Sequence, residues 1–344
     1  MSAKHKPRVG KIRRRADWGK LDVKLHTLRG RAGRLAQLPH RRQDPAADAY
    51  GRVTRCRRCG LGAVEPLPSA EELPAFYRLE AYYTHGESHF QKGEAVTFAD
   101  RVRDHLAWRF DKGDPAKPER LIALAGKPAG EIRVLDIGCG HGNLLKEFKA
   151  LGAKAAGLDP DPEAVENLAK AGIAAHQGTG EAPPESLAGQ LFDIVIMTHA
   201  IEHCLDPVKA LATAFSLTRP GGVFLCEAPN CAATHFERFN IMSEMFDAPR
   251  HLYFFTPDTL RRVIEGAGFA IERDYYDGFL RHFTNSWRAT ENHIREGIVK
   301  DGGETSALPP AHSRMETIRL LMETALADKK KKYDCVGFVA RRPV

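Results

Sequence analysis

The segment Val134–Leu145, VLDIGCGHGNLL, decides the fold of this chain. A short aliphatic run carries Asp136 near its end, and Gly138, Gly140 and Gly142 follow at alternate positions before an amphipathic stretch begins. Glycine permits positive φ and brings bare backbone close to a ligand where a strand turns into a helix. The segment therefore predicts a ligand-binding loop between a buried strand and a helix.

The glycine spacing favours one ligand over another. Nicotinamide dinucleotides are bound by a G-x-G-x-x-G loop, whereas this loop is G-x-G-x-G with an acid before its first glycine. A carboxylate there would repel a pyrophosphate but suits a ligand that carries cationic ammonium and sulfonium groups. We interpret the loop as a site for S-adenosylmethionine (SAM), and the spacing disfavours an oxidoreductase. The predicted contacts are Asp136, Gly138, Cys139, Gly140 and Gly142.

From Glu119 onward, strand patterns alternate with helix patterns. The helices carry start signals in which a capping Asp or Thr precedes proline, at Asp161, Asp206 and Thr256. The pattern predicts an α/β fold with a doubly wound, seven-stranded, mostly parallel sheet, which binds ligands at the carboxyl ends of its strands. The expected strands are 132–137, 153–158, 173–176, 192–197, 222–227, 269–276 and 335–341.

Several residues at predicted strand ends extend the cofactor site. Asp159 lies 21 residues after Gly138, where doubly wound folds place an acid that binds ribose hydroxyls. The next helix already has its cap in Asp161, which favours the ligand interpretation. The segment 179–181 follows the third strand, where the adenine would lie, and an ordinary turn is an equally good interpretation. The predicted contacts are Asp159, Pro160, Thr179, Gly180, Glu181, Thr198 and His199.

Linked motifs carry a family resemblance over roughly residues 119–344. VLDIGCGHG, GLDPDP, GTGEAP, FDIVIMTHAIEH, LDP, RPGGVFLCEAPN and PRHLYFFTPDTLRRVIEGAGF, in this order and spacing, resemble class I SAM-dependent methyltransferases. They look most like the subfamily that includes ubiquinone O-methyltransferases and bacterial sugar and natural-product methyltransferases. The resemblance implies the seven-stranded Rossmann-like fold, SAM as cofactor and a small or polymeric acceptor. We expect a methyltransferase that acts at oxygen on a small-molecule or saccharide acceptor; no residue distinguishes O- from N- or C-methylation.

The end of the fourth predicted strand carries candidate catalytic residues. Glu202 and His203 of THAIEH would face the cofactor, and His251 of PRHLYFF would approach from a following loop. An acceptor hydroxyl loses its proton as it attacks the methyl group, and histidine titrates near working pH. Two alternatives stay open: Glu202 and His203 cap and orient the local helix, or a metal polarises the acceptor. The metal alternative rests on a resemblance to the E-x-x-E-H site of small-RNA 2′-O-methyltransferases. In this chain His199 stands in place of the first Glu, which disfavours a Mg²⁺ site because Mg²⁺ prefers oxygen ligands.

Residues 45–115 predict a smaller α+β module before the methyltransferase domain. A β-hairpin would carry Cys56 and Cys59, a short helix would start at Ser69 with Glu72 in a capping box, and a longer helix would follow. The module resembles one in which two C-x-x-C pairs hold zinc, but only one pair is present here. Because structural zinc normally needs four ligands, these thiols would need His40 or another histidine, and we expect no metal in this degenerate zinc ribbon. The apolar face expected on the longer helix is Val96, Ala99, Val102, Leu106 and Phe110.

Composition defines the remaining expectations. The chain has 344 residues and a net charge of +7, of which residues 1–43 supply +12, so the rest carries −5. Residues 1–44 predict a basic, disordered arm, and residues 116–344 predict the methyltransferase domain with a helical insertion at about 280–330. The arm raises an alternative function, a nucleic-acid-binding protein or an RNA methyltransferase. Seven scattered cysteines and the lack of a signal peptide or membrane span favour the cytoplasm; the oligomeric state is not indicated.

Overall fold

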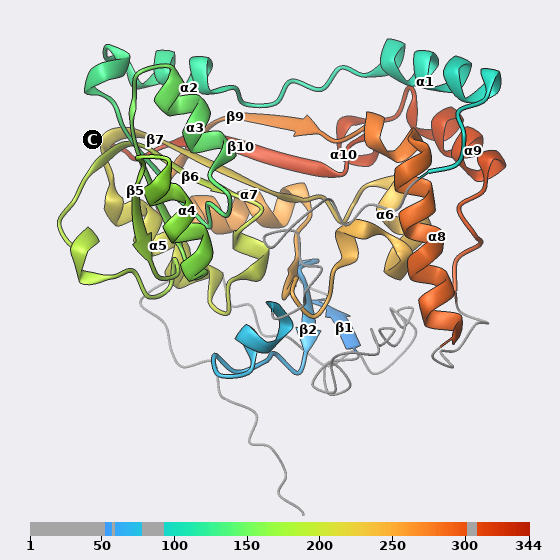
Figure 1. Ribbon diagram of the computed structural model, residues 1–344, viewed down its shortest axis with the longest axis horizontal. Helices are drawn as coiled ribbons and strands as arrows, with labels where there is room; N and C mark the ends of the chain where they lie inside the picture. Colours follow the sequence, from blue (N-terminus) through green and yellow to red (C-terminus); the bar gives the residue numbers. More distant parts are fainter. Residues whose placement is uncertain (1–51, 57–58, 78–92, 301–307) are drawn as a thin grey trace, which may run out of the picture.

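The computed structural model describes residues 52–56, 59–77, 93–300 and 308–344, and its centre is a seven-stranded sheet (Figure 1). The strand order is β5-β4-β3-β6-β7-β10-β9. Strands β3 to β7 pair in parallel, and β10 is antiparallel to both of its neighbours. The mostly parallel, seven-stranded sheet is therefore confirmed. Its strands are β3 (Arg133–Ile137), β4 (Lys154–Asp159), β5 (Ala174–Gln177), β6 (Phe192–Thr198), β7 (Thr218–Pro229), β9 (Ala270–Asp277) and β10 (Cys335–Arg341).

Helices cover both faces of the sheet, as the doubly wound prediction requires. Adjacent residues of one strand point to opposite faces, so Val134 packs in the core under α2, α3 and α4, while Leu135 packs in the core under α5 and α7. Strand β6 repeats this alternation with Ile194 and Val195. These helices are α2 (Pro118–Ala125), α3 (Asn143–Ala150), α4 (Pro162–Lys170), α5 (Pro207–Leu217) and α7 (Pro257–Gly266).

The expected helix caps are confirmed. Asp161 accepts a hydrogen bond from Glu163 N at the start of α4, and Asp206 accepts from the backbone at the start of α5. Thr256 caps α7. Short 3-10 turns complete the connections: η2 (Leu73–Tyr77), η3 (Ala129–Glu131), η4 (Glu185–Leu187), η5 (Ile201–His203), η6 (Asn240–Met242), η7 (Glu244–Phe246) and η8 (Leu280–Phe283).

The N-terminal hairpin is joined to the main domain by a shared sheet. Strands β1 (Arg52–Arg55) and β2 (Gly62–Glu65) form the predicted hairpin, and β2 also pairs with β8 (Tyr253–Phe254). Ser69 and Glu72 form the predicted capping box before η2. Because β8 begins two residues after His251, the shared sheet brings the hairpin and η2 to the segment that carries a candidate catalytic residue.

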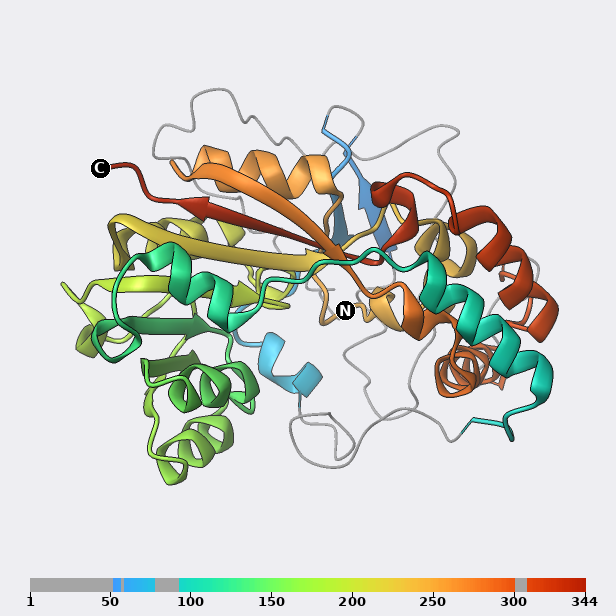
Figure 2. The same ribbon diagram turned by 90° about the horizontal axis from the view of Figure 1, so that it is seen from above.

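A second group of helices lies at the end of the sheet where β10 begins (Figure 2). It contains α1 (Phe98–Phe110), α6 (Thr234–Phe239), α8 (Asn285–Lys300), α9 (Arg314–Thr324) and α10 (Lys329–Lys332). The helices α8 and α9 lie within the segment before the last strand where helices were expected.

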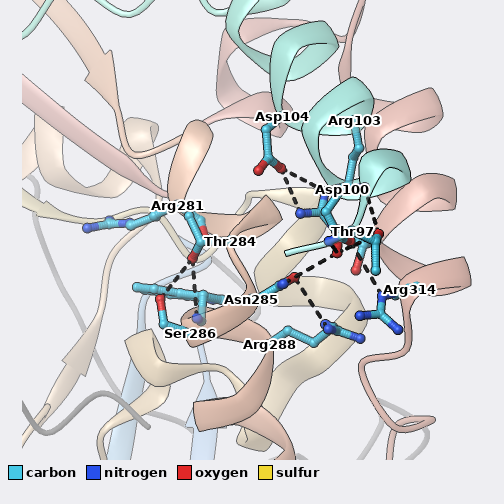
Figure 3. A network of polar contacts seen from close by, with 12 residues as sticks. Thr97, Asp100, Arg103, Asp104, Arg281, Thr284, Asn285, Ser286, Arg288 and Arg314 are labelled. Atoms are coloured by element: carbon cyan, nitrogen blue, oxygen red, sulfur yellow. Dashed lines mark hydrogen bonds and ion pairs between the residues drawn. The ribbon is translucent and has the colours of Figure 1, made fainter. Parts of the chain in front are cut away.

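The apolar face expected on α1 is mostly exposed, and of its five residues Phe110 alone packs against the core. Val96, Val102 and Leu106 are 43–58% exposed, and Ala99 is exposed as well, whereas Asp100, Arg103 and Ala107 are buried. Figure 3 shows the reason: the polar stripe of α1 meets the polar start of α8, so that Asp100 accepts hydrogen bonds from Arg103 (2.8 Å) and Asn285 (3.4 Å). Ion pairing and hydrogen bonding decide which side of this helix packs, and its apolar side faces outward.

The predicted basic arm, residues 1–44, and His40 within it lie outside the described residues. In the part of the chain that the structure describes, no helix has the length and apolar character needed to cross a membrane.

Candidate active site

The glycine loop between β3 and α3 has the predicted backbone conformation. Gly138, Gly140 and Gly142 have φ values of +77°, +47° and +65°. A Cβ on Gly138 would lie 2.6 Å from Ala200 Cβ, and one on Gly142 would lie 2.1 Å from Leu168 Cδ2. At Gly140, a Cβ would meet no described atom within 4 Å. Packing therefore requires two of the glycines, while the third exposes bare backbone to open space.

Two buried carboxyl groups flank this loop. Asp159 accepts hydrogen bonds from Gly140 N (2.8 Å) and Asp161 N (2.9 Å), and burial raises its pKa. Asp136 is 3% exposed, and its Oδ1 has no hydrogen-bond partner among the described residues. Burial, reinforced by the charge of Asp159, raises the pKa of Asp136 to about 7. An unpartnered buried carboxyl oxygen beside an open loop fits a ligand with a cationic group, as SAM has.

The other predicted cofactor contacts lie at the same edge of the sheet, and several have structural tasks. Cys139 lies in the glycine loop, and Pro160 follows β4. Thr179 Oγ1 accepts from Ala182 N within a turn, and Glu181 accepts from the backbone N–H of Asp206 at the start of α5. A Cβ on Gly180 would lie 3.0 Å from Ala210 Cβ, because the turn packs closely against α5. The turn interpretation of 179–181 thus has direct support, and contact with a cofactor stays a prediction.

His199 follows β6 in a strained conformation and sits between acids. Its φ is +50°, which is uncommon outside glycine. Nε2 lies 3.1 Å from Glu227 Oε1, and Nδ1 lies 3.5 Å from Glu202 Oε1. Partial burial favours the neutral ring, but Cys335, Glu202 and Glu227 outweigh it and raise the pKa of His199 well above its ordinary value. With 40% of its side chain exposed, His199 presents a positive charge to the solvent beside Glu202 and Glu227.

Glu202, His203 and His251 come together as predicted. The His203 and His251 rings are 4.7 Å apart, and His251 Nε2 lies 4.0 Å from Glu202 Oε1. Glu202 is fully buried, and neither of its oxygens has a hydrogen-bond partner in the described residues. Burial would raise its pKa, but the positive His199 ring lowers it to about 2.

The two histidines have defined tautomers. His203 Nδ1 lies 3.0 Å from Arg250 O, and His251 Nδ1 lies 3.0 Å from Met245 O. A carbonyl only accepts, so each Nδ1 carries a proton, and in the neutral form of either ring the lone pair lies on Nε2. Burial first, and then His251, lower the pKa of His203 to about 4. Titration near neutrality, expected from the sequence, is therefore wrong for His203, which is neutral at pH 7.

Sequence reasoning missed three participants. Tyr77 of η2 places its hydroxyl 3.1 Å from His203 Nδ1, so the N-terminal unit reaches the site. Glu227 and Cys335 flank His199 from β7 and β10. In the sequence Glu227 follows the apolar run Val223–Cys226, as Asp159 follows an apolar run in β4, a signal that could have identified it; no local pattern marks Tyr77 or Cys335.

Cys56 and Cys59 lie in the turn of the hairpin as thiols. Among the described residues, neither belongs to a group of three or more metal-ligating side chains. The groups that do occur are His199–Glu227–Cys335, Glu202–His203–His251 and His235–Glu291–His312. The absence of a metal at the two thiols stays a prediction.

Comparison with known proteins identifies the family. A family model described as a methyltransferase domain matches residues 108–273. The ubiquinone biosynthesis O-methyltransferase of Methylobacterium sp. (strain 4-46) is 31% identical over 181 residues, which are 49% of this chain and 69% of the relative. The protein of that name from Cereibacter sphaeroides (strain KD131 / KCTC 12085) is 31% identical over 179 residues, which are 49% of this chain and 69% of that relative.

Among solved structures, a SAM-dependent methyltransferase from Archaeoglobus fulgidus is 19% identical and covers 70% of this chain and 94% of its own, with a TM-score of 0.41. The family match and the curated relatives agree with the glycine loop and the seven-stranded sheet. The chain belongs to the class I SAM-dependent methyltransferases, and SAM is its methyl donor.

Proposed function

We propose that this enzyme methylates an oxygen of a small-molecule acceptor, and that His203 accepts the acceptor's proton. The observation that carries the proposal is the His203 ring, which lies on η5 shortly after β6, is neutral at pH 7 and has its Nε2 lone pair to accept a proton. The ubiquinone O-methyltransferase relatives favour oxygen as the methylated atom and a small acceptor. A saccharide acceptor is the finer alternative that the sequence resemblance raises.

The protein's own groups would prepare the acceptor in three ways. SAM supplies an electrophilic methyl group on sulfonium, so the acceptor needs only positioning and loss of a proton. Arg250 O and Tyr77 hold His203 in the tautomer that accepts a proton at Nε2. The positive His199 ring would stabilise negative charge that develops on the acceptor oxygen.

A screen with labelled SAM against phenols, sugar nucleotides and RNA tests the proposal. We expect transfer to a hydroxyl of a small molecule. Transfer to RNA alone would instead favour the nucleic-acid alternative, and its dependence on residues 1–43 and on salt would then show whether the basic segment binds the substrate.

A divalent metal held by Glu202, His203 and His251 is the second candidate mechanism. Within the described residues neither Glu202 oxygen has a hydrogen-bond partner, both histidines turn Nδ1 to a backbone carbonyl, and one ligand atom from each of the three residues lies within 4.8 Å of the others. Two imidazoles and one carboxylate suit a transition metal better than Mg²⁺. Activity that is lost in EDTA and restored by Zn²⁺ or Mn²⁺ would favour this mechanism, whereas full activity after chelation and dialysis would favour His203 as the base.

We expect Asp159→Ala to weaken SAM binding by about 1–3 kcal/mol, because Asp159 is the proposed partner of the ribose hydroxyls and also holds Gly140 N. Calorimetry measures the change. Asp161→Ala is the matched control: it removes the α4 cap and about 1 kcal/mol of stability, with a smaller effect on SAM. Equal losses in both variants would contradict a direct role for Asp159.

SAM affinity should depend on pH through Asp136. Its pKa of about 7 in the free protein means that a cationic ligand must displace a proton below pH 7. Affinity should therefore fall by about tenfold per pH unit below pH 7 and level off above it. Titrations from pH 5.5 to 8.5 measure this slope, which Asp136→Asn should abolish. A pH-independent wild-type affinity would contradict the assignment.

A further inference from the structure

Arg281 lies beside the proposed acceptor site, and two separate chains of contacts place it there. Its Nη2 is 2.9 Å from Cys335 Sγ, which lies 3.7 Å from His199 Nε2. The same Nη2 is 3.7 Å from the sulfur of Met245, whose carbonyl accepts the hydrogen bond of His251. Arg281 is thus a near neighbour of residues on both sides of the site.

A buried carboxylate fixes the position of this guanidinium. Asp334 is 1% exposed and accepts from Arg281 Nε at 2.8 Å and Nη2 at 2.5 Å, as well as from His282 Nε2 at 2.7 Å. Gly278, with φ of +89°, leaves room for the pair, since a Cβ there would lie 1.8 Å from Asp334 Oδ1. The Arg281 guanidinium also lies over the Trp287 ring, 5.1 Å from its centre. The charge is therefore held in place before any acceptor binds.

One edge of the guanidinium remains available. Nη1 has no hydrogen-bond partner in the described parts of the chain, and the side chain is 32% exposed. Figure 3 shows the side chain extending away from the contacts between α1 and α8. On Nη2, the sulfur partners are weak acceptors, so an oxygen anion could replace them at little cost.

Charge is distributed unevenly around the site. The cationic groups, Arg281 and His199, are 32% and 40% exposed. The carboxylates that pair with these cations are more deeply buried: the Glu202 and Asp334 side chains are each 1% exposed, and that of Glu227 is 15% exposed. An acceptor that enters the site would meet the cations first.

We propose that Arg281 binds an anionic group of the acceptor, and that the substrate class is a small hydroxylated carboxylic acid. A carboxylate matches the planar edge formed by Nη1 and Nη2. Asp334 acts as a positioning residue for this edge. The inference rests on the proposed O-methylation, because it assumes that the hydroxyl to be methylated lies near His203.

Two probes that differ by one carboxylate test the inference. Catechol and 3,4-dihydroxybenzoate offer the same hydroxyl groups, and initial rates with labelled SAM give kcat and KM for each. We expect wild-type protein to prefer the acid at least about tenfold in kcat/KM, since a hydrogen bond to a charged group is worth about one to two decades. A wild type that methylates both probes without preferring the acid would overturn the proposal.

The decisive variant removes both charges of the pair. Arg281→Met alone would leave Asp334 buried with His282 alone, a strongly destabilising change, so the double variant Arg281→Met/Asp334→Asn is the primary test. We expect the ratio of the two kcat/KM values to fall by about 10–100-fold, mainly through KM for the acid. An unchanged ratio would overturn the proposal, because loss of a purely structural group lowers both rates alike. Arg281→Lys, which keeps the charge, should restore part of the preference.

A matched control and a binding experiment separate the inference from the proposed function. Arg238→Met removes another ion-paired arginine, one bound to Glu316 and Glu323, and should leave the ratio unchanged. If neither phenol is methylated, the O-methylation proposal fails for phenols. Calorimetry of benzoate with protein saturated in S-adenosylhomocysteine then tests Arg281 alone: binding that weakens about tenfold or more in the double variant supports it, and absence of binding to wild type overturns it.

Discussion

Replacing His203 with alanine is expected to lower turnover by about 10²–10⁴-fold, the usual contribution of a general base. SAM affinity should stay within about twofold of the wild type, because the cofactor loop and its two flanking acids, Asp136 and Asp159, lie on β3, β4 and the turn after β3. Single-turnover rates and calorimetric titration of SAM measure the two quantities separately.

The pH profile gives an independent readout of the same variant. The pKa of His203 is about 4, so the base is deprotonated at neutral pH and activity should fall only as the pH drops through about 4. The residual activity of His203→Ala should lack this limb. Tyr77→Phe, which removes the hydroxyl at His203 Nδ1, should have a much smaller effect, since Arg250 O still holds the ring. Wild-type turnover in His203→Ala, or loss of its fold, would contradict a catalytic role.

The sheet could be predicted because its signals are local. Each buried strand is a short aliphatic run, and the helices between them start at marked caps such as Asp161 and Asp206. The glycine loop was also predictable, since its positive φ values and close approach to Leu168 leave little choice of residue. In these segments the structure that the local sequence favours is the structure that the whole fold requires.

The α1 helix was mispredicted because its burial is decided by a partner far away in sequence. An apolar stripe usually packs inward, yet Asp100 and Arg103 are buried against Asn285, some 185 residues later. A single sequence does not reveal that a buried polar stripe will find its partners on another helix.

The same limit applies to the site. Glu202, His203 and His251 could be proposed from the sequence because they lie in recognisable motifs. Tyr77 and Arg281 were not, since each reaches the site only through tertiary contacts: pairing of β2 with β8 in one case, and the Asp334 carboxylate in the other. The burial that lowers the pKa of His203 also arises only in the folded protein.

Gly140→Ala and Gly142→Ala, two residues apart in one loop, are expected to fail in different ways. Gly142 has φ of +65°, and a Cβ there would lie 2.1 Å from Leu168 Cδ2, so alanine adds both backbone strain and overpacking. Together these cost about 2–5 kcal/mol of unfolding free energy. Thermal or urea unfolding of the cofactor-free protein measures this loss.

Gly140 has a similar φ of +47°, but a Cβ there would meet no described atom within 4 Å. Gly140→Ala should therefore cost only the strain of the left-handed conformation, about 1–2 kcal/mol. Its methyl group would instead occupy the open space beside Asp159, so SAM affinity should fall by at least about tenfold, as expected where bare backbone must approach the ligand. If Gly140→Ala binds SAM as the wild type does, the cofactor does not approach the loop at this glycine. If Gly142→Ala is as stable as Gly140→Ala, Leu168 can move to make room for the added methyl group. The packing of α4 against the loop would then not require glycine at position 142.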